Sequence, residues 1–353
     1  MAKKLNWIEI AALYIGIIMG AGFASGRECW QFFGVFGVKG YYGGIVVALG
    51  FVLFACMLTY IARSKKTAKL GSLISPFNNN RLDGMLGTIL AIFYYFDFIV
   101  MSAAGGSLLN QEFGISKVIG GLLIAVFVIL TVIGNFEKIS GVFRILVPFL
   151  FVIAVLMIIL VVKADFPEHK LDHMEPGAMS PNWLISSITF LAYNTLAMIT
   201  MSGNTAINAK NTVNIYIGAT TGALCLGCLI LGQLTALLTD MPYTASLDLP
   251  MLGYSLRISP VLNAMYAIVL FGSVYSTGAS CYFGFTTILP ENDSKKRIII
   301  IGAILGFALG LTGFQNLVEF LYPTQGYIGL LYLGLITINF INELRKNKKC
   351  QSS

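Results

Sequence analysis

Three glycines interrupt the first long apolar run of the chain, and this interruption constrains the fold more than any other feature. They are Gly20, Gly22 and Gly26. Each glycine destabilises a helix by about 1 kcal/mol relative to alanine. Ser25 and Glu28 then have the spacing of a capping box, with Ser25 at the N-cap and Glu28 at position N3. The sequence therefore predicts that one helix ends near Met19 and that a second begins near Gly26.

The composition places this break inside a membrane. Hydrophobic residues make up 57% of the chain and charged residues 11%, whereas a soluble domain has about 25% charged residues. Non-helical backbone at membrane depth is tolerated only where it is buried in protein or lines a cavity. Free carbonyl groups at such a break can hold a cation, and free N–H groups can hold an anionic group. Discontinuous helices of this kind are typical of secondary transporters.

Apolar stretches long enough to cross a bilayer, about 20 residues each, recur along the 353 residues, and we count ten. They are 7–37 (broken), 41–61, 84–109, 116–133, 143–162, 182–205, 212–239, 260–289, 297–312 and 315–342. We expect one transporter domain over 1–353, with a first five-helix repeat at 1–162 and a second, inverted repeat at 182–342. The second repeat should then have a break of its own. We place it at Ala192–Thr195, where Asn194 tolerates non-helical backbone.

The distribution of positive charge predicts the orientation. Most of the 23 Lys and Arg residues fall on one side of the membrane when the N-terminus is placed inside. The positive-inside rule then predicts that both termini are cytoplasmic, in a multi-pass protein of the bacterial inner membrane. The net charge of +7 reflects these loops and does not indicate a nucleic-acid partner. The loop 240–259, with its prolines, is expected to form short helices that pack over the outer mouth.

Span eight carries hydroxyl groups on a single helical face. They belong to Ser273, Ser276, Thr277 and Ser280. One interpretation is close helix packing with interhelical hydrogen bonds. The other is a sodium site, because a hard cation takes oxygen ligands. Two hydroxyl groups and a carbonyl from this span, with two carbonyls from the end of the first half-helix, would supply five oxygens.

Charged residues at membrane depth are further candidates. Asp97 lies midway along span three, where a carboxylate is costly and therefore indicates function. It could carry a proton, bind an ion, pair with a substrate amine, or only hold a neighbouring helix. Tyr94, one turn away, could donate to a substrate carboxylate or merely pack. Arg27 and Glu319 could form a reversible ion pair across the outer mouth, or act as independent interfacial charges.

The segment from Gly20 to Glu28 reads Gly-Ala-Gly-Phe-Ala-Ser-Gly-Arg-Glu and opens a ten-span chain. In this it resembles the YkvI-like family of proposed amino acid permeases, in the amino acid–polyamine–organocation superfamily. The resemblance covers essentially the whole chain. It implies the LeuT-type fold, an all-α polytopic membrane protein with two inverted five-helix repeats in which helices 1 and 6 are discontinuous.

The resemblance also implies roles for particular residues. Sodium would be bound by the carbonyls of Gly16 and Met19 together with Ser273, Ser276 and Thr277. The substrate would meet the unwound backbone and a tyrosine of span three, Tyr94 or Tyr95. The full set of expected substrate-binding residues is Gly20, Ala21, Gly22, Phe23, Ala24, Tyr94, Asp97, Tyr193 and Asn194. The outer gate would pair Arg27 with Glu319.

These observations predict a secondary active transporter and not an enzyme. We expect sodium-coupled symport of an amino acid or related small zwitterion by alternating access, without a cofactor. A proton-coupled permease that uses Asp97 is the alternative, and a membrane receptor or scaffold without transport is a further one. The expected partners are the small-molecule substrate and the lipid bilayer, with no nucleic acid. The sequence leaves the oligomeric state open.

Overall fold

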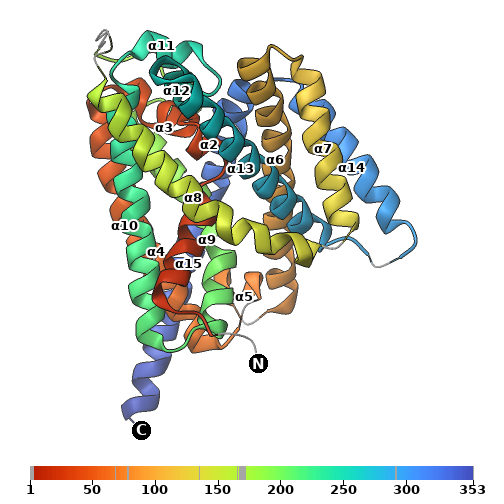
Figure 1. Ribbon diagram of the computed structural model, residues 1–353. Helices are drawn as coiled ribbons and strands as arrows, with labels where there is room; N and C mark the ends of the chain where they lie inside the picture. Colours follow the sequence, from red (N-terminus) through yellow and green to blue (C-terminus); the bar gives the residue numbers. More distant parts are fainter. Residues whose placement is uncertain are drawn as a thin grey trace.

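The computed structural model describes the chain from residue 4 to residue 352, apart from 68, 78, 135, 165, 167–171 and 291. For residues 136–147, 204, 207 and 348–352 it describes the backbone only. The described residues form fifteen α-helices and one short 3-10 helix (Figure 1). The fold is therefore all-α, as predicted.

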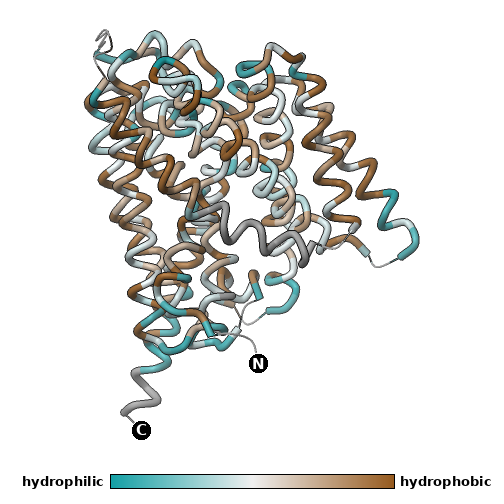
Figure 2. Tube along the Cα trace, in the orientation of Figure 1, coloured by the Kyte–Doolittle hydropathy of each residue, from teal (hydrophilic) through white to brown (hydrophobic). Residues whose placement is uncertain are grey.

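Nine long helices correspond to predicted spans two to ten, and each overlaps its predicted range. They are α4 (Lys39–Lys65), α6 (Asn80–Phe113), α7 (Lys117–Ile133), α8 (Phe136–Lys163), α9 (Trp183–Asn208), α10 (Thr212–Leu237), α13 (Pro260–Thr286), α14 (Lys295–Gly310) and α15 (Phe314–Ser352). Among the described helices, six are long and apolar enough to cross a membrane. Hydrophobic residues run along the helices, and hydrophilic residues gather at the two ends of the molecule (Figure 2).

The first predicted span is broken where the glycines lie. It consists of α1 (Trp7–Ile18), α2 (Ala21–Ala24) and α3 (Arg27–Phe32), followed by the 3-10 helix at Gly34–Phe36. Gly20 has an extended backbone, which ends the first helical segment. Gly26 has φ of +79°, a conformation that glycine adopts without steric cost. The predicted end near Met19 and restart near Gly26 are confirmed.

The predicted capping box is wrong. The N-cap of α3 is Gly26, and no side chain caps this helix. The Ser25 hydroxyl instead donates to the carbonyl of Gly22 at 3.1 Å. Because Gly26 turns the chain through the left-handed region, the Glu28 side chain leaves the helix end and reaches back over the break.

The predicted break in span six is also wrong, because α9 is a continuous helix from Trp183 to Asn208. The Asn194 side chain donates to the carbonyl of Phe190, four residues earlier, at 3.0 Å. The Thr195 hydroxyl likewise donates to the carbonyl of Leu191 at 2.7 Å. These bonds follow the helix instead of replacing it, and no glycine lies between Ala192 and Thr195 to release the backbone.

The long helices pack in two groups. One group holds α1, α4, α9 and α10, and the other holds α6, α7, α13 and α14. The first group thus contains the first two spans of each predicted half, and the second group contains the third and fourth. This sorting is what two five-helix repeats of opposite orientation would produce. The repeat boundaries at 162 and 182 stay a prediction.

Short helices close the two ends of the molecule. The first turn of α1 and the last turns of α15 share one end with α5 (Leu70–Ile74), and we call this the termini end (Figure 1). The opposite end carries α11 (Met241–Ser246) and α12 (Pro250–Ile258), and we call it the α11–α12 end. Short helices in the loop 240–259 are therefore found as predicted.

Close approach of α1 to α10 depends on glycine, and this can be tested. A Cβ at Gly218 would lie 2.6 Å from the Trp7 carbonyl oxygen and 2.7 Å from the Ile10 Cβ. We expect Gly218→Leu to destabilise the protein by about 1–3 kcal/mol or more, since overpacking forces backbone shifts. Gly334 has no neighbour within 4 Å of such a Cβ, so Gly334→Leu is the matched control. Melting temperatures in detergent that fall equally for both variants would contradict this packing.

Candidate functional site

The end of α1 meets the hydroxyl-bearing face of α13. The Ser273 hydroxyl, which is buried, donates to the carbonyl of Met19 at 3.1 Å. The Gly20 N–H donates to the Ile18 carbonyl at 2.7 Å, so the carbonyl of Gly16 loses the donor that a continuous helix would give it. A Cβ at Gly20 would lie 3.4 Å from the methyl group of Thr277. Oxygens from two helix groups therefore converge at the break.

The predicted ion ligands are not equally placed. Met19 and Ser273 are in direct contact, and Thr277 lies against Gly20 beside them. The Ser276 hydroxyl donates to the carbonyl of Ser273 within its own helix, at 3.1 Å. The structure thus brings most of the predicted set together, with the Ser276 hydrogen directed along α13. Neutral hydroxyl and carbonyl oxygens suit a hard monovalent cation better than a soft metal.

The carboxylate of Glu28 lies directly over Gly22. Glu28 is 3% exposed, and its carboxylate accepts a hydrogen bond from the Tyr193 hydroxyl. A Cβ on Gly22 would overlap this carboxylate. The backbone N–H of Phe23 also lies within hydrogen-bonding range of the Glu28 side chain. Glycine at position 22 is therefore what lets the carboxylate reach the unwound segment.

Aromatic rings fix the donor of this hydrogen bond. The ring of Tyr193 stacks on that of Tyr322, with centroids 4.8 Å apart and an interplanar angle of 8°. It stacks on Phe32 at 6.0 Å on another side, and Phe190 meets it edge-on at 5.6 Å. Such ring contacts leave Tyr193 little rotational freedom. Its hydroxyl is thereby held toward Glu28.

Asp97 lies close to this group but on α6, in the other helix group. Its carboxylate accepts from the Gln325 side-chain amide at 3.1 Å, and the Cys281 sulfur lies 4.0 Å away. Asp97 and Glu28 are near enough to interact electrostatically. The Tyr94 ring packs toward Gly284, and its hydroxyl lies within electrostatic range of Asp97, so these two residues are close together as predicted.

Sequence reasoning missed three residues of this site. Glu28 was assigned to a helix cap, although an acid at membrane depth is a functional signal in its own right. Tyr322 and Gln325 lie on α15, next to Glu28 and Asp97 in space. A polar residue beside Pro323 in an apolar span was the available signal for Gln325. Nothing in the sequence indicates the ring contact of Tyr322, because it depends on how α15 packs on α9.

The two predicted gate residues approach each other without forming an ion pair. Arg27 is 2% exposed and donates to the carbonyl of Leu247 at 3.3 Å. Its guanidinium lies within electrostatic range of Asp248 and Glu319. Neither of the ion pairs found among the described residues joins Arg27 to Glu319. In this structure Arg27 instead anchors the segment that precedes α12.

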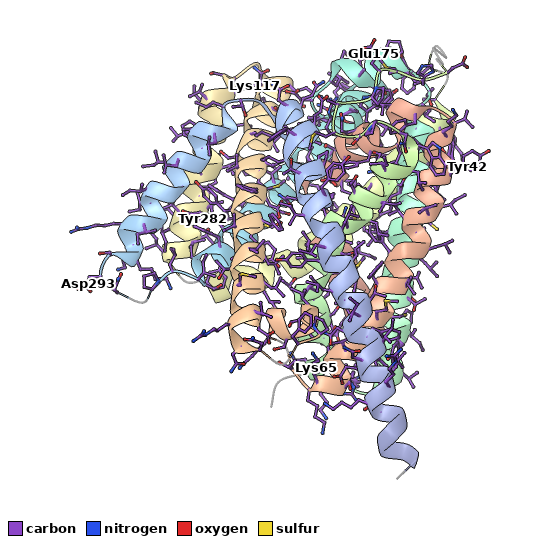
Figure 3. All side chains as sticks on the ribbon, turned by 180° about the vertical axis from the view of Figure 1, so that it is seen from behind. Tyr42, Lys65, Lys117, Glu175, Tyr282 and Asp293 are labelled. Carbon is purple, nitrogen blue, oxygen red and sulfur yellow. The ribbon has the colours of Figure 1, made fainter. Side chains whose placement is uncertain are left out.

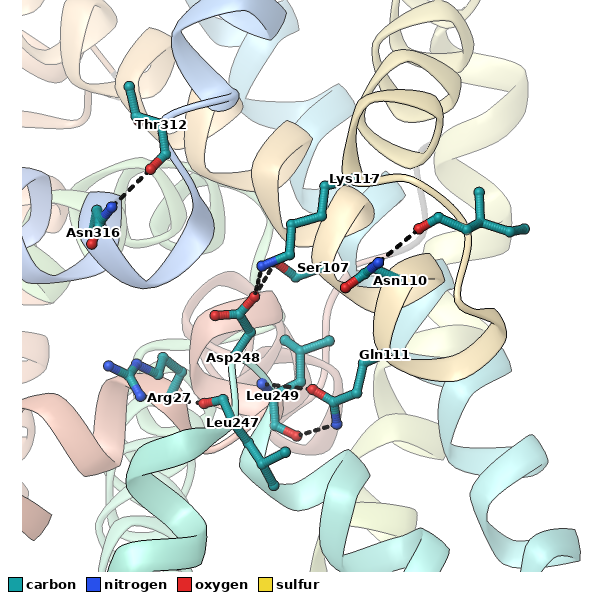
Figure 4. A network of polar contacts seen from close by, with 11 residues as sticks. Arg27, Ser107, Asn110, Gln111, Lys117, Leu247, Asp248, Leu249, Thr312 and Asn316 are labelled. Carbon is teal, nitrogen blue, oxygen red and sulfur yellow. Dashed lines mark hydrogen bonds and ion pairs between the residues drawn. The ribbon is translucent and has the colours of Figure 1, made fainter.

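That segment ties both helix groups together (Figure 4). Asp248 accepts from Ser107 at 2.8 Å and pairs with Lys117. Gln111 exchanges two hydrogen bonds with the backbone of Leu249, at 3.1 and 3.2 Å. The Met251 N–H donates to the Ser25 carbonyl at 2.9 Å. Because 247–251 thus joins α3 to α6 and α7, the unwound segment is covered from the α11–α12 end.

The covered end and the opposite end are well separated. Lys117 and Glu175 lie at the α11–α12 end, and Lys65 lies at the termini end (Figure 3). Every residue of α3 is buried. The site is therefore closed toward the α11–α12 end in this structure.

Comparison with known proteins supports the membrane fold. No protein-family model matches the chain. The chain is 25% identical over 337 residues to the uncharacterized membrane protein YkvI of Bacillus subtilis (strain 168), covering 93% of this chain and 94% of that protein. It is 24% identical over 328 residues to the uncharacterized protein YyaD of the same organism, covering 91% and 93%. The resemblance to YkvI is thus confirmed along nearly the whole chain, and membership of the superfamily stays a prediction.

Solved structures show the fold. A manganese transporter of Eremococcus coleocola, mutant H236A, matches with a TM-score of 0.57 at 13% identity, over 95% of this chain and 78% of that chain. Mhp1, a nucleobase-cation-symport-1 family transporter in a closed conformation with bromovinylhydantoin bound, matches with a TM-score of 0.58 at 14% identity, over 91% and 75%. The chain is a polytopic helical membrane protein with the LeuT-type fold.

The cover over the unwound segment gives a test of this geometry. Cys29 on α3 is buried beneath it. We expect Asp248→Asn to speed the labelling of Cys29 by a water-soluble maleimide several-fold, because losing the bond network favours local opening. The measurement uses variants in which Cys29 is the sole cysteine. Asp293→Asn, in the connection between α13 and α14 and far from the cover, is the control, and equal labelling rates would show that Asp248 does not hold the cover.

Proposed function

We propose that this protein is a secondary active transporter that couples the movement of sodium to that of a small amine-bearing solute, such as an amino acid or a related compound. The hydrogen bond from Ser273 to the Met19 carbonyl carries this proposal. It joins the broken end of α1 to α13, and these helices belong to different packing groups. An ion bound here would hold the two groups together.

Alternating access follows from the same arrangement. The group of α1, α4, α9 and α10 would rock against the group of α6, α7, α13 and α14 around the break. The substrate would bind at Gly20–Ala24, near Glu28 and Tyr193, with Asp97 on the opposing group. A neutral oxygen cage binds a monovalent ion modestly, so that the ion can leave after each cycle.

The charge distribution orients the transporter. The positive-inside rule would place the termini end in the cytoplasm and the α11–α12 end outside, in a bacterial inner membrane. The structure would then be closed toward the outside. Arg27 and Glu319 would pair only when the segment 247–251 moves, since Arg27 now donates to Leu247.

A proton-coupled transporter is the second candidate, and Asp97 favours it. Among the described residues, Asp97 meets the neutral donors Gln325 and Cys281 and forms no ion pair. A carboxylate without a counter-ion at membrane depth gains stability when it binds a proton. Asp97 could then carry the coupling proton instead of sodium.

Sodium binding should stabilise the protein by linkage, since the ion binds the native state alone. At 100 times its dissociation constant, sodium would add about 2.7 kcal/mol. We expect a higher melting temperature in sodium than in potassium at equal ionic strength. A Ser276→Ala/Thr277→Ala double variant should lose this difference. Equal melting temperatures in the two salts, over a wide concentration range, would favour the proton-coupled candidate.

The second candidate makes its own prediction for uptake into proteoliposomes. If Asp97 carries the coupling proton, Asp97→Asn should remove the pH dependence of uptake while substrate exchange continues. Glu112, whose carboxylate accepts from Asn263 at the α11–α12 end, offers Glu112→Gln as a matched control. Wild-type uptake that does not change with pH, beyond changes in stability, would rule out the proton role.

Substrate binding should depend on Gly22. We expect Gly22→Leu to abolish uptake while the protein stays folded. The new side chain would displace the Glu28 carboxylate and cover the unwound backbone to which the substrate is proposed to bind. Gly87 has no neighbour within 4 Å of an added Cβ, so Gly87→Leu controls for the size of the side chain. Normal uptake by Gly22→Leu would place the substrate elsewhere.

A further inference from the structure

The chain supplies a carboxylate of its own at the unwound segment. Glu28 reaches back over Gly22, accepts from the Tyr193 hydroxyl and lies within range of the Phe23 N–H. A substrate carboxylate would seek these same donors, because free backbone N–H groups are where an anionic group binds. The internal carboxylate already fills that position. A substrate with its own carboxylate would have to displace a buried, hydrogen-bonded group.

Among the residues whose side chains are described, no Lys or Arg forms an ion pair with this carboxylate. Among the described residues, neither Glu28 nor Asp97 takes part in an ion pair, although the two acids lie in electrostatic range of each other. Two carboxylates within electrostatic range of each other in a membrane interior are costly. A positively charged ligand between them would relieve the cost. The described part of the site therefore holds two acids and no basic residue paired with either of them.

The surroundings of the two acids also suit an organic cation. The hydroxyl that contacts Glu28 belongs to Tyr193, whose ring stacks with those of Tyr322 and Phe32, and aromatic rings near an acid favour an ammonium group. On the Asp97 side, the Tyr94 hydroxyl oxygen is buried. It lies near Thr200 and Asp97, yet it has hydrogen-bond geometry with no described residue. A buried polar atom without a partner is the position at which a ligand can complete a bond.

We propose that the substrate is an organic amine without a carboxylate, and that Glu28 is the specificity-determining residue that receives its ammonium group. This inference rests on the proposed transport function and narrows its substrate class. Glu28 takes the place that the carboxylate of an amino acid would occupy, so the protein distinguishes an amine from the corresponding amino acid. Asp97 contributes a second negative charge from the opposing helix group.

Thermal stabilisation by matched ligands tests this proposal. The probes are phenethylamine, phenylalanine and 3-phenylpropionate, with isoamylamine, leucine and 4-methylpentanoate as an aliphatic set, all in sodium buffer. We expect the amines to stabilise the wild-type protein and the acids to have no effect. Glu28→Gln should weaken amine binding by about tenfold or more, as expected when one partner of a buried charge pair is lost. Glu112→Gln should leave it unchanged.

A variant that gains affinity for an amino acid provides a further test, because misfolding cannot produce a gain in binding. Glu28→Ala frees the Tyr193 hydroxyl and the Phe23 N–H, so we expect this variant to bind phenylalanine or leucine better than the matching amine.

Three results would overturn the proposal. They are an amino acid that stabilises the wild type as well as its amine, amine binding that survives in Glu28→Gln, and the failure of both amines to bind. The comparison of melting temperatures in sodium and potassium shows whether the substrate proposal alone has failed or the proposed transport function as well. Stabilisation by sodium, lost in the Ser276/Thr277 double variant, supports transport whichever ligand binds. A Glu28 variant that is still stabilised by sodium is folded.

Discussion

The backbone break between Gly20 and Gly26 imposes the strongest constraint on this molecule, because carbonyls released at membrane depth must find donors within the protein. Side chains and one backbone amide from four helices supply them. Ser273 donates to Met19, Gln233 to Phe23, Tyr266 to Ala24, the Met251 N–H to Ser25, and Ser186 to Phe32. The helices α9, α10, α12 and α13 are thus each joined to the first span by a polar bond. Packing around the break is specified by hydrogen bonding as much as by apolar contact.

The sequence predicts the break because its cause is local. Gly20 takes an extended backbone and Gly26 a left-handed one, so the helix ends and restarts at positions that the glycines themselves mark. Each long apolar run likewise forms a helix. Glu28 shows where this reasoning fails. Its spacing from Ser25 fits a cap, but the left-handed turn at Gly26 redirects the side chain toward Tyr193. The partner is far away in sequence, so only the tertiary structure could identify it.

The hydroxyl groups on one face of α13 likewise separate what the sequence predicts from what only the packing decides. Helical periodicity correctly places Ser273 and Thr277 on the face toward α1, since spacing along one helix is a local property. Which hydroxyl bonds across the interface is decided by the depth at which α1 ends. Ser273 meets the Met19 carbonyl, whereas Ser276 bonds within its own helix. The packing and ion-site interpretations are thus compatible, because the same hydroxyl can bridge the helices directly or share an ion between them.

The continuity of α9 changes how the site can recognise charge. Two broken helices would offer released carbonyls and released N–H groups from both halves of the chain, enough for the amine and the carboxylate of one zwitterion. Here α9 runs unbroken through Asn194, so the described site has the backbone ends of one break. The Glu28 carboxylate lies over Gly22, within range of the Phe23 N–H on that side of the break. The acceptor groups near the break are then the carboxylate of Glu28, the carbonyl of Gly16 and the carboxylate of Asp97. With one break instead of two, the proposed recognition of a cation has a structural basis, whereas the carboxylate of a zwitterion would have fewer backbone N–H groups to meet.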